Sequence, residues 1–433
     1  MKNKNIFEKC FLIILVIINV FMYIMEIYIT EFWAYITLFL SFLTILKFKN
    51  NIALFFMFFC IFYFEYSFIV SRYISSTPIL PVLYEQIRFD STYFIGISGV
   101  MFFHIGILLF SPKSKDVVPM SSFLEQTQDK EKNIVSIKSI ILTAFISLFI
   151  FNYQIFTIIP LPRTLYEYLI IFFVLAFYYA RNEKIMKKVL FVLMFINVAI
   201  DFLQGGRAIV LQPILAWLFL CFSKYLTAKR MTIVAVVGLI FFTALGIYGD
   251  NISMGRSISE SLSYVSPHNM INTFQRRKLA LDTSVSAYWT GLTFVEMSNI
   301  HSIDMRVGNF VDYISKYTIL GGSSGYEQLY EQSLQYYIHY NGGIISNYAF
   351  YWLGYIGILL LGAIFGKILQ YFSSLQNNAS EFSKIFFIYF ISTMPRWFLY
   401  YPTPLIRGTV LLFIVYVFIN FITSNKRKEK KYE

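Results

Sequence analysis

The chain alternates between long apolar stretches and shorter polar connections along most of its length. A helix needs about 20 apolar residues to cross a bilayer. Stretches near that length occupy 11–29, 32–46, 52–71, 92–110, 139–158, 165–180, 189–204, 208–223, 231–248, 346–371, 383–401 and 406–423. We therefore predict an all-α polytopic membrane protein with about 12 transmembrane helices. An even number of crossings places both termini on one side of the membrane.

One polar stretch is much longer than the others. Residues 249–345 contain no apolar run of spanning length, so we predict one large, partly helical loop outside the membrane. The chain then divides into residues 1–248 with transmembrane helices 1 to 9, the loop at 249–345, and residues 346–433 with helices 10 to 12 and a basic tail. The segment 327–340 has helical character, and we expect it to lie on the membrane surface.

Composition agrees with this pattern. Hydrophobic residues make up 57% of the chain and charged residues only 14%, which excludes a soluble domain of this size. The formal net charge of +12 does not require nucleic acid, because Lys-rich cytoplasmic loops produce such an excess. Cys10, Cys60 and Cys221 lie in or beside apolar runs, so we expect neither a disulfide framework nor redox chemistry.

The short polar connections predict the orientation. The basic ones alternate regularly with the others and all fall on the side of the N-terminus: Lys47 and Lys49, Lys113 to Lys138, Arg181 to Lys188, Lys224 to Arg230, and the tail from Lys426 to Lys431. By the positive-inside rule this side is cytoplasmic. The long loop and the turns at 205–207 and 394–405 are therefore expected on the outer side.

The kind of positive charge differs between the two sides. The predicted outer side carries mainly arginines, namely Arg72, Arg88, Arg163, Arg207, Arg256, Arg276, Arg277, Arg306, Arg396 and Arg407. Lysine dominates the inner side. Because the guanidinium group is a planar fork that holds phosphate or carboxylate at two points, the outer face is suited to binding anions. Some of these arginines instead have a simpler explanation, because arginine also pairs with loop acids and anchors helix ends among lipid headgroups.

Three arginines fit that simpler explanation least well. Arg207, Arg396 and Arg407 lie at predicted outer ends of helices, where an unpaired charge is costly. Arg207 follows Gly205 and Gly206, which allow a ligand to approach the backbone closely. A helix that begins after Arg207 also directs its positive N-terminal dipole to the same place.

Two short motifs and the topology together resemble a known family. Gly205-Gly206-Arg207 opens a helix, a large outer loop precedes the last three helices, and the run 351–357 reads Tyr-Trp-Leu-Gly-Tyr-Ile-Gly. The chain resembles the bacterial O-antigen and capsular polysaccharide polymerases, the Wzy-type oligosaccharide repeat-unit polymerases. The resemblance implies a GT-C-like membrane glycosyltransferase that joins undecaprenyl-pyrophosphate-linked oligosaccharide units at the outer face of the bacterial cytoplasmic membrane. It also implies a chain-length regulator and a flippase as candidate partners, besides membrane lipids.

The resemblance extends to the O-antigen ligases, which share the large loop. Ligases carry a histidine about eleven residues before the first glycine of a Gly-x-x-Gly motif. The corresponding position here is Gly343, and His339 lies four residues earlier, which favours a polymerase over a ligase. A lipid-linked oligosaccharide flippase or another transporter is the further alternative.

Transfer from a glycosyl pyrophosphate needs fixed positive charge at the departing pyrophosphate and an acceptor for the hydroxyl proton. We assign the first role to Arg207 with Arg396 or Arg407. For the second we favour His268 or His339, and the other candidates are Asp250, Glu327 and Glu331. Candidate substrate-binding residues in the loop are Arg256, Arg276, Arg277, Glu327 and Tyr336. The alternatives are a solvated basic patch for the Arg276–Arg277 pair and an interfacial aromatic for Tyr336.

No cofactor or metal is expected, because the carboxylates and histidines of the loop are scattered singly and not at ligand spacing. A few ionisable residues fall inside predicted helices, namely Glu65, His104 and Asp201. Charges are rare at such positions and mark functional candidates by default. We expect Asp201 to pair with an arginine.

Overall fold

The computed structural model describes residues 2–74, 87, 89–120, 137–152, 168–203, 208–276, 279–320, 325–337, 342–374 and 380–429. These residues form helices and their connections, without a β-strand. Within them, seven helices are long and apolar enough to cross a membrane: Ile6–Ile24, Thr30–Lys47, Ile52–Ile69, Asp90–Phe110, Lys229–Ile252, Ile345–Ser373 and Thr403–Thr423. The chain is therefore an all-helical, multi-pass membrane protein.

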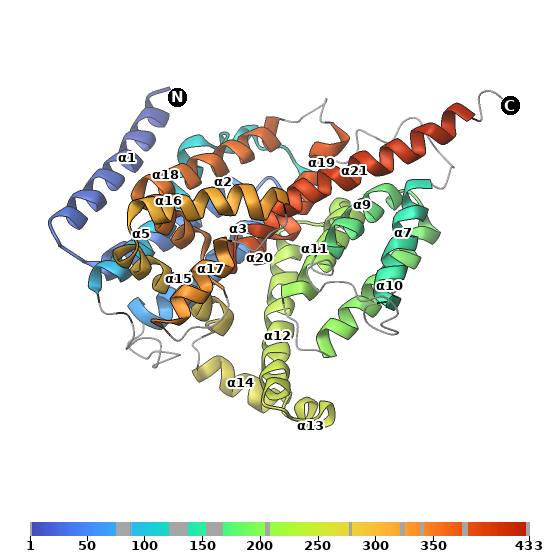
Figure 1. The fold of residues 1–433 in the computed structure, drawn as a ribbon, viewed down its shortest axis with the longest axis horizontal. Helices are drawn as coiled ribbons and strands as arrows, with labels where there is room; N and C mark the ends of the chain where they lie inside the picture. Colours follow the sequence, from blue (N-terminus) through green and yellow to red (C-terminus); the bar gives the residue numbers. More distant parts are fainter. Residues whose placement is uncertain are drawn as a thin grey trace. The chain divides into compact units, whose positions relative to one another are not determined.

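The helices gather into two compact units (Figure 1). Unit 1 contains residues 1–118, 274–374 and 397–402, and unit 2 contains residues 119–273, 375–396 and 403–433. Each unit thus combines segments from distant parts of the sequence, and the predicted loop at 249–345 contributes to both.

Unit 1 is built around α5 (Asp90–Phe110), which is buried along almost its whole length. Its most extensive contact is with the long helix α18 (Ile345–Ser374). The two helices approach closely because Gly106 faces the backbone of Gly362, where a methyl group on Gly106 would collide with main-chain atoms. The remaining helices of the amino-terminal part are α1 (Lys2–Ile24), α2 (Thr30–Lys47) and α3 (Ile52–Ile69), which continues as a π-helical turn at Val70–Ile74.

The predicted outer loop supplies a buried helix to unit 1. Helix α15 (Asp282–Ile300) packs against α3, α5 and α18, and most of its side chains are buried. Its start is attached to α3, because the Leu281 N–H donates to Ser67 Oγ of α3 at 3.0 Å. At its other end Glu296 accepts a hydrogen bond from Thr92, near the start of α5. The helices α16 (Ile303–Asp312) and α17 (Gly325–Leu334) follow it, joined by a π-helical stretch at Tyr313–Leu320.

Unit 2 contains the helices between residues 119 and 273 and most of those at the carboxyl end of the chain. In chain order they are α7 (Ile137–Ile150), α9 (Leu169–Ala180), α10 (Lys184–Leu203), α11 (Ala208–Phe222), α12 (Ala228–Ser253), α13 (Ile258–Ser263), most of α14 (Pro267–Arg276), α19 (Glu381–Ser392), the start of α20 (Met394–Leu399) and α21 (Thr403–Glu429). Figure 1 shows α12 ending where α13 and α14 begin. Side-chain caps fix several helix starts; Thr227, for example, accepts from the Arg230 N–H at the start of α12.

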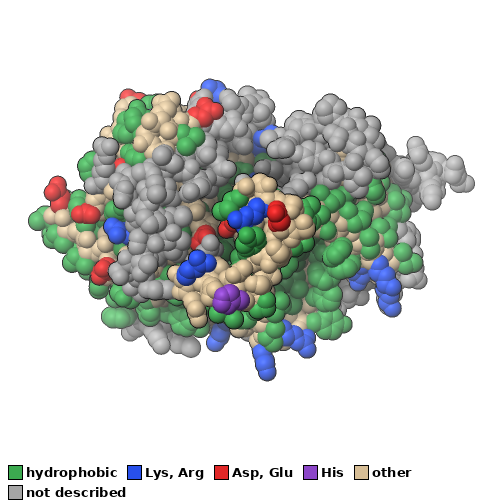
Figure 2. Space-filling model, turned by 90° about the horizontal axis from the view of Figure 1, so that it is seen from below, with side chains coloured by type: hydrophobic (Ala, Val, Ile, Leu, Met, Phe, Trp, Pro, Cys, Tyr) green, Lys and Arg blue, Asp and Glu red, His purple; other side chains and the backbone are tan. Residues whose placement is uncertain are grey.

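Every apolar stretch predicted from the sequence contains a helix, although the described part of the sixth, 165–180, begins only at residue 168. The stretch 383–401 is divided in two, because α19 ends before Thr393 and α20 begins at Met394. Whether about 12 of these helices cross the membrane stays a prediction. The least buried spans, in α1, α12 and α21, carry many exposed hydrophobic side chains. Figure 2 shows hydrophobic side chains over wide areas of one face, as contact with lipid requires.

Candidate functional site

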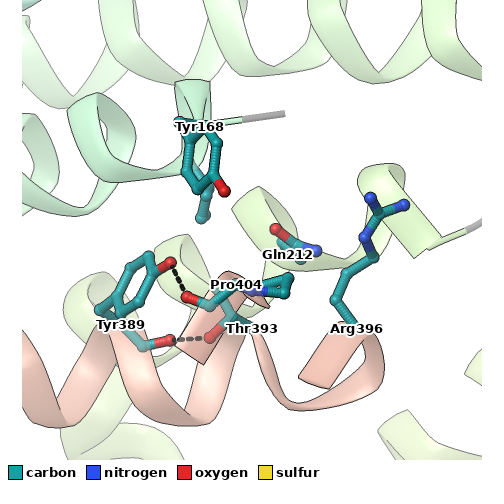
Figure 3. Close-up of a pocket in the computed structure, with 7 residues that line it drawn as sticks. Tyr168, Gln212, Tyr389, Thr393, Arg396 and Pro404 are labelled. Carbon is teal, nitrogen blue, oxygen red and sulfur yellow. Dashed lines mark hydrogen bonds between the residues drawn. The ribbon is translucent and has the colours of Figure 1, made fainter. Parts of the chain in front are cut away.

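A recess in unit 2 contains one of the predicted catalytic arginines (Figure 3). Its walls come from the ends of five helices, α9, α11, α19, α20 and α21, and from the residues beside them. The lining residues are Tyr168, Ile170, Gln212, Tyr389, Thr393, Arg396 and Pro404. All of these ends belong to the side that the charge pattern predicts to face outward. The recess therefore brings together helix ends that are more than 200 residues apart in the sequence, from Tyr168 to Pro404.

Two hydrogen bonds among the lining residues form the floor of the recess, one between α19 and α21 and one at the end of α19. The Tyr389 hydroxyl donates to the Pro404 carbonyl at 2.5 Å, and the Thr393 hydroxyl donates to the Tyr389 carbonyl at 2.8 Å. The phenol can cross to α21 only because Gly408 has no side chain, since a methyl group there would occupy the position of the Tyr389 hydroxyl. This contact fixes the two helices around the Arg396 turn.

Arg396 lies in the short helix α20, directly after the break that follows α19. Its backbone N–H donates to the Thr393 carbonyl at 3.0 Å, which begins the new helical turn. In Figure 3 its side chain rises on the side of Gln212, away from Tyr389. Arg396 is half-buried, whereas Gln212 is only 5% exposed. The guanidinium and amide groups thus bring N–H donors to one side of the recess.

Arg407 approaches the same place from α21. Its guanidinium carbon lies 5.6 Å from the centre of the Tyr168 ring, within the range of a cation–π contact. Tyr168 in turn lines the recess. Two of the three arginines predicted to act on the pyrophosphate therefore belong to unit 2, where Arg396 lines the recess and Arg407 contacts a residue that lines it. The third, Arg207, lies outside the described residues, but α11 begins at the next residue, Ala208, and carries Gln212 into the recess.

The chemistry of the recess favours an anion. Its enclosed volume is only about 10 Å³, enough for about one water molecule. A group the size of a phosphate oxygen fits, whereas a sugar ring would have to lie outside it. Among the seven lining residues there is one guanidinium and no carboxylate. Such a site can hold a phosphate oxygen by charge-assisted hydrogen bonds.

The described loop candidates are divided between the two units, with Arg256 and His268 in unit 2 and Arg276 and Tyr336 in unit 1. His268 and Arg276 are exposed on α14, where His268 Nε2 lies 2.9 Å from Asn272 Nδ2. Arg256 donates to Asn251 Oδ1 and stacks on the Tyr264 ring at 4.3 Å, so the simpler structural role suits it. Tyr336 is 57% exposed just beyond α17.

The other predicted site residues are not described at the level of side chains. Glu327 lies in α17, and the structure describes its backbone but not its side chain. Arg277 and His339 lie outside the described residues. Their assigned roles stay predictions.

A second polar cluster, in unit 1, involves an arginine for which the sequence suggested no particular role. Gly354 interrupts α18 with φ of 61° and ψ of −148°, a conformation open essentially to glycine alone. Arg306 of α16 binds the helix just before this break, since its Nη2 donates to the Phe350 carbonyl at 3.0 Å and its Nε donates to the Tyr351 carbonyl.

The same cluster holds His301 and Trp352. His301 Nδ1 lies 2.7 Å from the Tyr351 hydroxyl, and Trp352 Nε1 donates to Asn309 Oδ1 at 2.9 Å. Burial, and then the nearby Arg306 charge, lower the pKa of His301. The neutral imidazole is therefore favoured, and its Nδ1 accepts a hydrogen bond from the Tyr351 hydroxyl. The Tyr-Trp-Leu-Gly motif thus forms a broken helix that α16 holds in place.

Glu296 is a buried carboxylate that sequence reasoning missed. It is 1% exposed and accepts hydrogen bonds from the Phe89 N–H and the Thr92 hydroxyl, each at 3.3 Å, and from the Tyr337 hydroxyl at 2.9 Å. Nothing in the local sequence distinguishes it from the other loop acids. Only the burial of α15 reveals its position.

The ionisable residues inside helices have defined partners. Glu65 and His104 are bonded to each other at 2.6 Å and are fully buried in unit 1. Asp201, which is 4% exposed in unit 2, accepts a hydrogen bond from Asn197 Nδ2 at 3.1 Å. Its pairing with an arginine stays a prediction.

Comparison of the chain with protein-family models, with curated proteins and with solved structures finds no match. Within the described ranges, no three His, Cys, Asp or Glu side chains are grouped so that they could hold a metal ion. The functional interpretation therefore rests on the residues of this chain alone.

Proposed function

We propose that the protein polymerises undecaprenyl-pyrophosphate-linked oligosaccharide repeat units into O-antigen or capsular polysaccharide. The reaction takes place on the outer face of the bacterial cytoplasmic membrane, with both termini in the cytoplasm. About 12 transmembrane helices then form a GT-C-like glycosyltransferase. The observation that carries this proposal is the recess of unit 2, where Arg396 and, through Tyr168, Arg407 converge without a lining carboxylate.

In this reaction a hydroxyl of the acceptor unit attacks the anomeric carbon of the growing chain. The bond from that carbon to the pyrophosphate oxygen breaks, and the polyprenyl pyrophosphate departs with the bonding electrons. Arg396, Arg407 and Arg207 stabilise the charge that develops on the leaving group. The guanidinium groups thereby do the work of a divalent cation, so the transfer is independent of metal.

The hydroxyl proton goes to His268 or His339. Neutral imidazole is a suitable acceptor because its unperturbed pKa lies near physiological pH. Arg256, Arg276, Arg277, Glu327 and Tyr336 would guide the second lipid-linked unit. A chain-length regulator and a flippase are the protein partners that such a polymerase requires.

Two other functions share these features. An O-antigen ligase-like transferase would use the same arginines on the same leaving group. A lipid-linked oligosaccharide flippase or transporter is favoured by one specific observation, the buried Glu65–His104 pair in unit 1, because transporters place ionisable residues deep in the membrane. The arginines at the helix ends of unit 2 favour transfer over transport.

Surface-glycan gels of a strain lacking the gene separate these functions. The polymerase proposal predicts glycans with a single repeat unit and no ladder of longer chains, restored by the wild-type gene. Complete loss of surface glycan would indicate a flippase. Normal-length chains left on the lipid carrier would indicate a ligase.

A further inference from the structure

Three polar side chains meet inside the apolar helices of unit 1. Thr44 of α2, Glu65 of α3 and His104 of α5 are each 0% exposed. His104 Nε2 lies 2.6 Å from Glu65 Oε1, and His104 Nδ1 lies 3.1 Å from Thr44 Oγ1. His104 lies six residues, or about 9 Å of helix, before the end of α5, so the cluster is enclosed by the helices of unit 1 near the carboxyl end of α5.

Thr44 determines which imidazole nitrogen carries a proton. Its Oγ1 lies 2.9 Å from the Leu40 carbonyl, which can only accept. The single hydroxyl proton of Thr44 is used in that bond, so Oγ1 accepts from His104 Nδ1–H. Nε2 is then the nitrogen whose protonation depends on Glu65.

Burial determines how many protons lie between Nε2 and Oε1. Without a proton the pair has a net charge of −1, and two lone pairs face each other. With two protons its net charge is +1, and two donors face each other. Either charge is strongly disfavoured where both side chains are fully buried. With one proton the pair is neutral, and its short hydrogen bond is satisfied.

The second carboxyl oxygen indicates where that proton resides. Glu65 Oε2 is buried and has no hydrogen-bond partner. In an ionised carboxylate this oxygen would carry half of a negative charge without a donor, whereas in a protonated carboxyl it is a neutral carbonyl oxygen. Leaving the neutral oxygen unpaired costs far less free energy. The geometry therefore favours a Glu65 Oε1–H donor and a neutral His104 acceptor.

No other described group neutralises the pair. Lys47, one turn from Thr44 on α2, donates to the Leu108 carbonyl at 2.7 Å, and Tyr63 of α3 donates to the Leu279 carbonyl at 2.5 Å. The further described ionisable groups on the helices of the cluster and on those packed against them are Glu8, Lys9, Cys10, Tyr23, Glu31, Tyr35, Cys60, Tyr66, Arg72, Tyr73, Asp90, Tyr93, Asp282, Tyr288, Glu296, Tyr348, Tyr351, Tyr355, Lys367 and Tyr371. Within the described ranges, His104 is the ion-pair partner of Glu65.

We propose that Glu65 and His104 form a proton-binding site in unit 1, in which Glu65 donates one bound proton to His104 Nε2. The proton acts as a ligand that joins α3 to α5. Its removal would leave a buried carboxylate facing the imidazole lone pair and would force these helices apart. The site is separate from the glycosyl transfer proposed above and does not depend on it.

Infrared spectroscopy of the purified full-length protein at neutral pH tests the proposal. A protonated carboxyl has a C=O stretching band apart from that of a carboxylate. We expect this band in the wild-type protein, its loss in Glu65→Gln, and its retention in the control Glu381→Gln, which alters a carboxylate 35% exposed near Lys138. A folded wild-type protein without a band that depends on Glu65 would overturn the proposal.

A second variant covers the case in which Glu65→Gln fails to fold. His104→Gln replaces the nitrogen acceptor with an amide oxygen, so the band is expected to shift in frequency. A band at the wild-type frequency in this variant would also contradict the proposal. No substrate is added in the infrared experiment. Its result is therefore independent of the glycan gels, which test the proposed polymerase function.

Discussion

Replacing Arg396 with lysine is expected to reduce chain elongation about 10²–10³-fold, the usual effect of removing one preorganised donor from a charged transition state. Lysine keeps the positive charge but loses the planar fork that holds two phosphate oxygens together. Elongation is measured as the rate of ladder formation on surface-glycan gels, in cells that express the wild type and the variant at equal levels. Arg207→Lys is expected to have a similar effect.

The matched control for this prediction is Arg230→Lys. Arg230 is exposed at the start of α12 in the same unit and donates to the Tyr225 carbonyl at 2.6 Å, outside the recess. We expect normal glycan lengths in this variant. If Arg396→Lys also gives wild-type lengths, Arg396 has only a structural or headgroup-anchoring role.

Replacing Arg306 with alanine is expected to destabilise unit 1 by about 2–4 kcal/mol, because the carbonyls at the break in α18 lose their donor. The side chain is only partly buried, so water replaces some of the lost bonding, and the estimate allows for this. The loss is measured as a lower melting temperature of the purified protein in detergent, by roughly 5 °C or more.

Lys316→Ala provides the control for Arg306. Lys316 is 61% exposed and pairs with Asp312 one turn earlier in the same segment, a contact that contributes little to stability. We expect its melting temperature to equal that of the wild type. A melting temperature that Arg306→Ala leaves unchanged would mean that α18 holds its break without α16.

The apolar stretches predicted the helices well because membrane insertion depends on local hydropathy. The sorting of arginines also directed attention to Arg396 and Arg407, whose helix ends the structure brings to one recess. The choice of these two arginines needed only the predicted ends of the helices and the charges of the polar connections between them. Both can be read without knowledge of packing.

Other features depend on contacts between distant segments. Helix α15 begins with Asp282 and contains Glu296, so its composition resembles an exposed loop, and only packing against α3, α5 and α18 buries it. The floor of the recess likewise requires the Tyr389 hydroxyl to meet the Pro404 carbonyl across Gly408. No spacing in the sequence predicts these contacts.

The bond between Glu65 and His104 shows the same limit. The sequence identified both residues as unusual within apolar helices, yet 39 residues separate them, and nothing local indicates that they face each other. The packing of α3 and α5 on the shared partners α2 and α15 brings them within hydrogen-bond distance, and Thr44 then fixes the tautomer.

Reconstitution tests the polymerase proposal most directly. The purified full-length protein in lipid vesicles is mixed with synthetic polyprenyl-pyrophosphate-linked repeat units, and the products are separated by length. The proposal predicts chains of two or more units, with one polyprenyl pyrophosphate released for each bond formed. Units that cross the bilayer but never lengthen would contradict it and would identify a transporter instead.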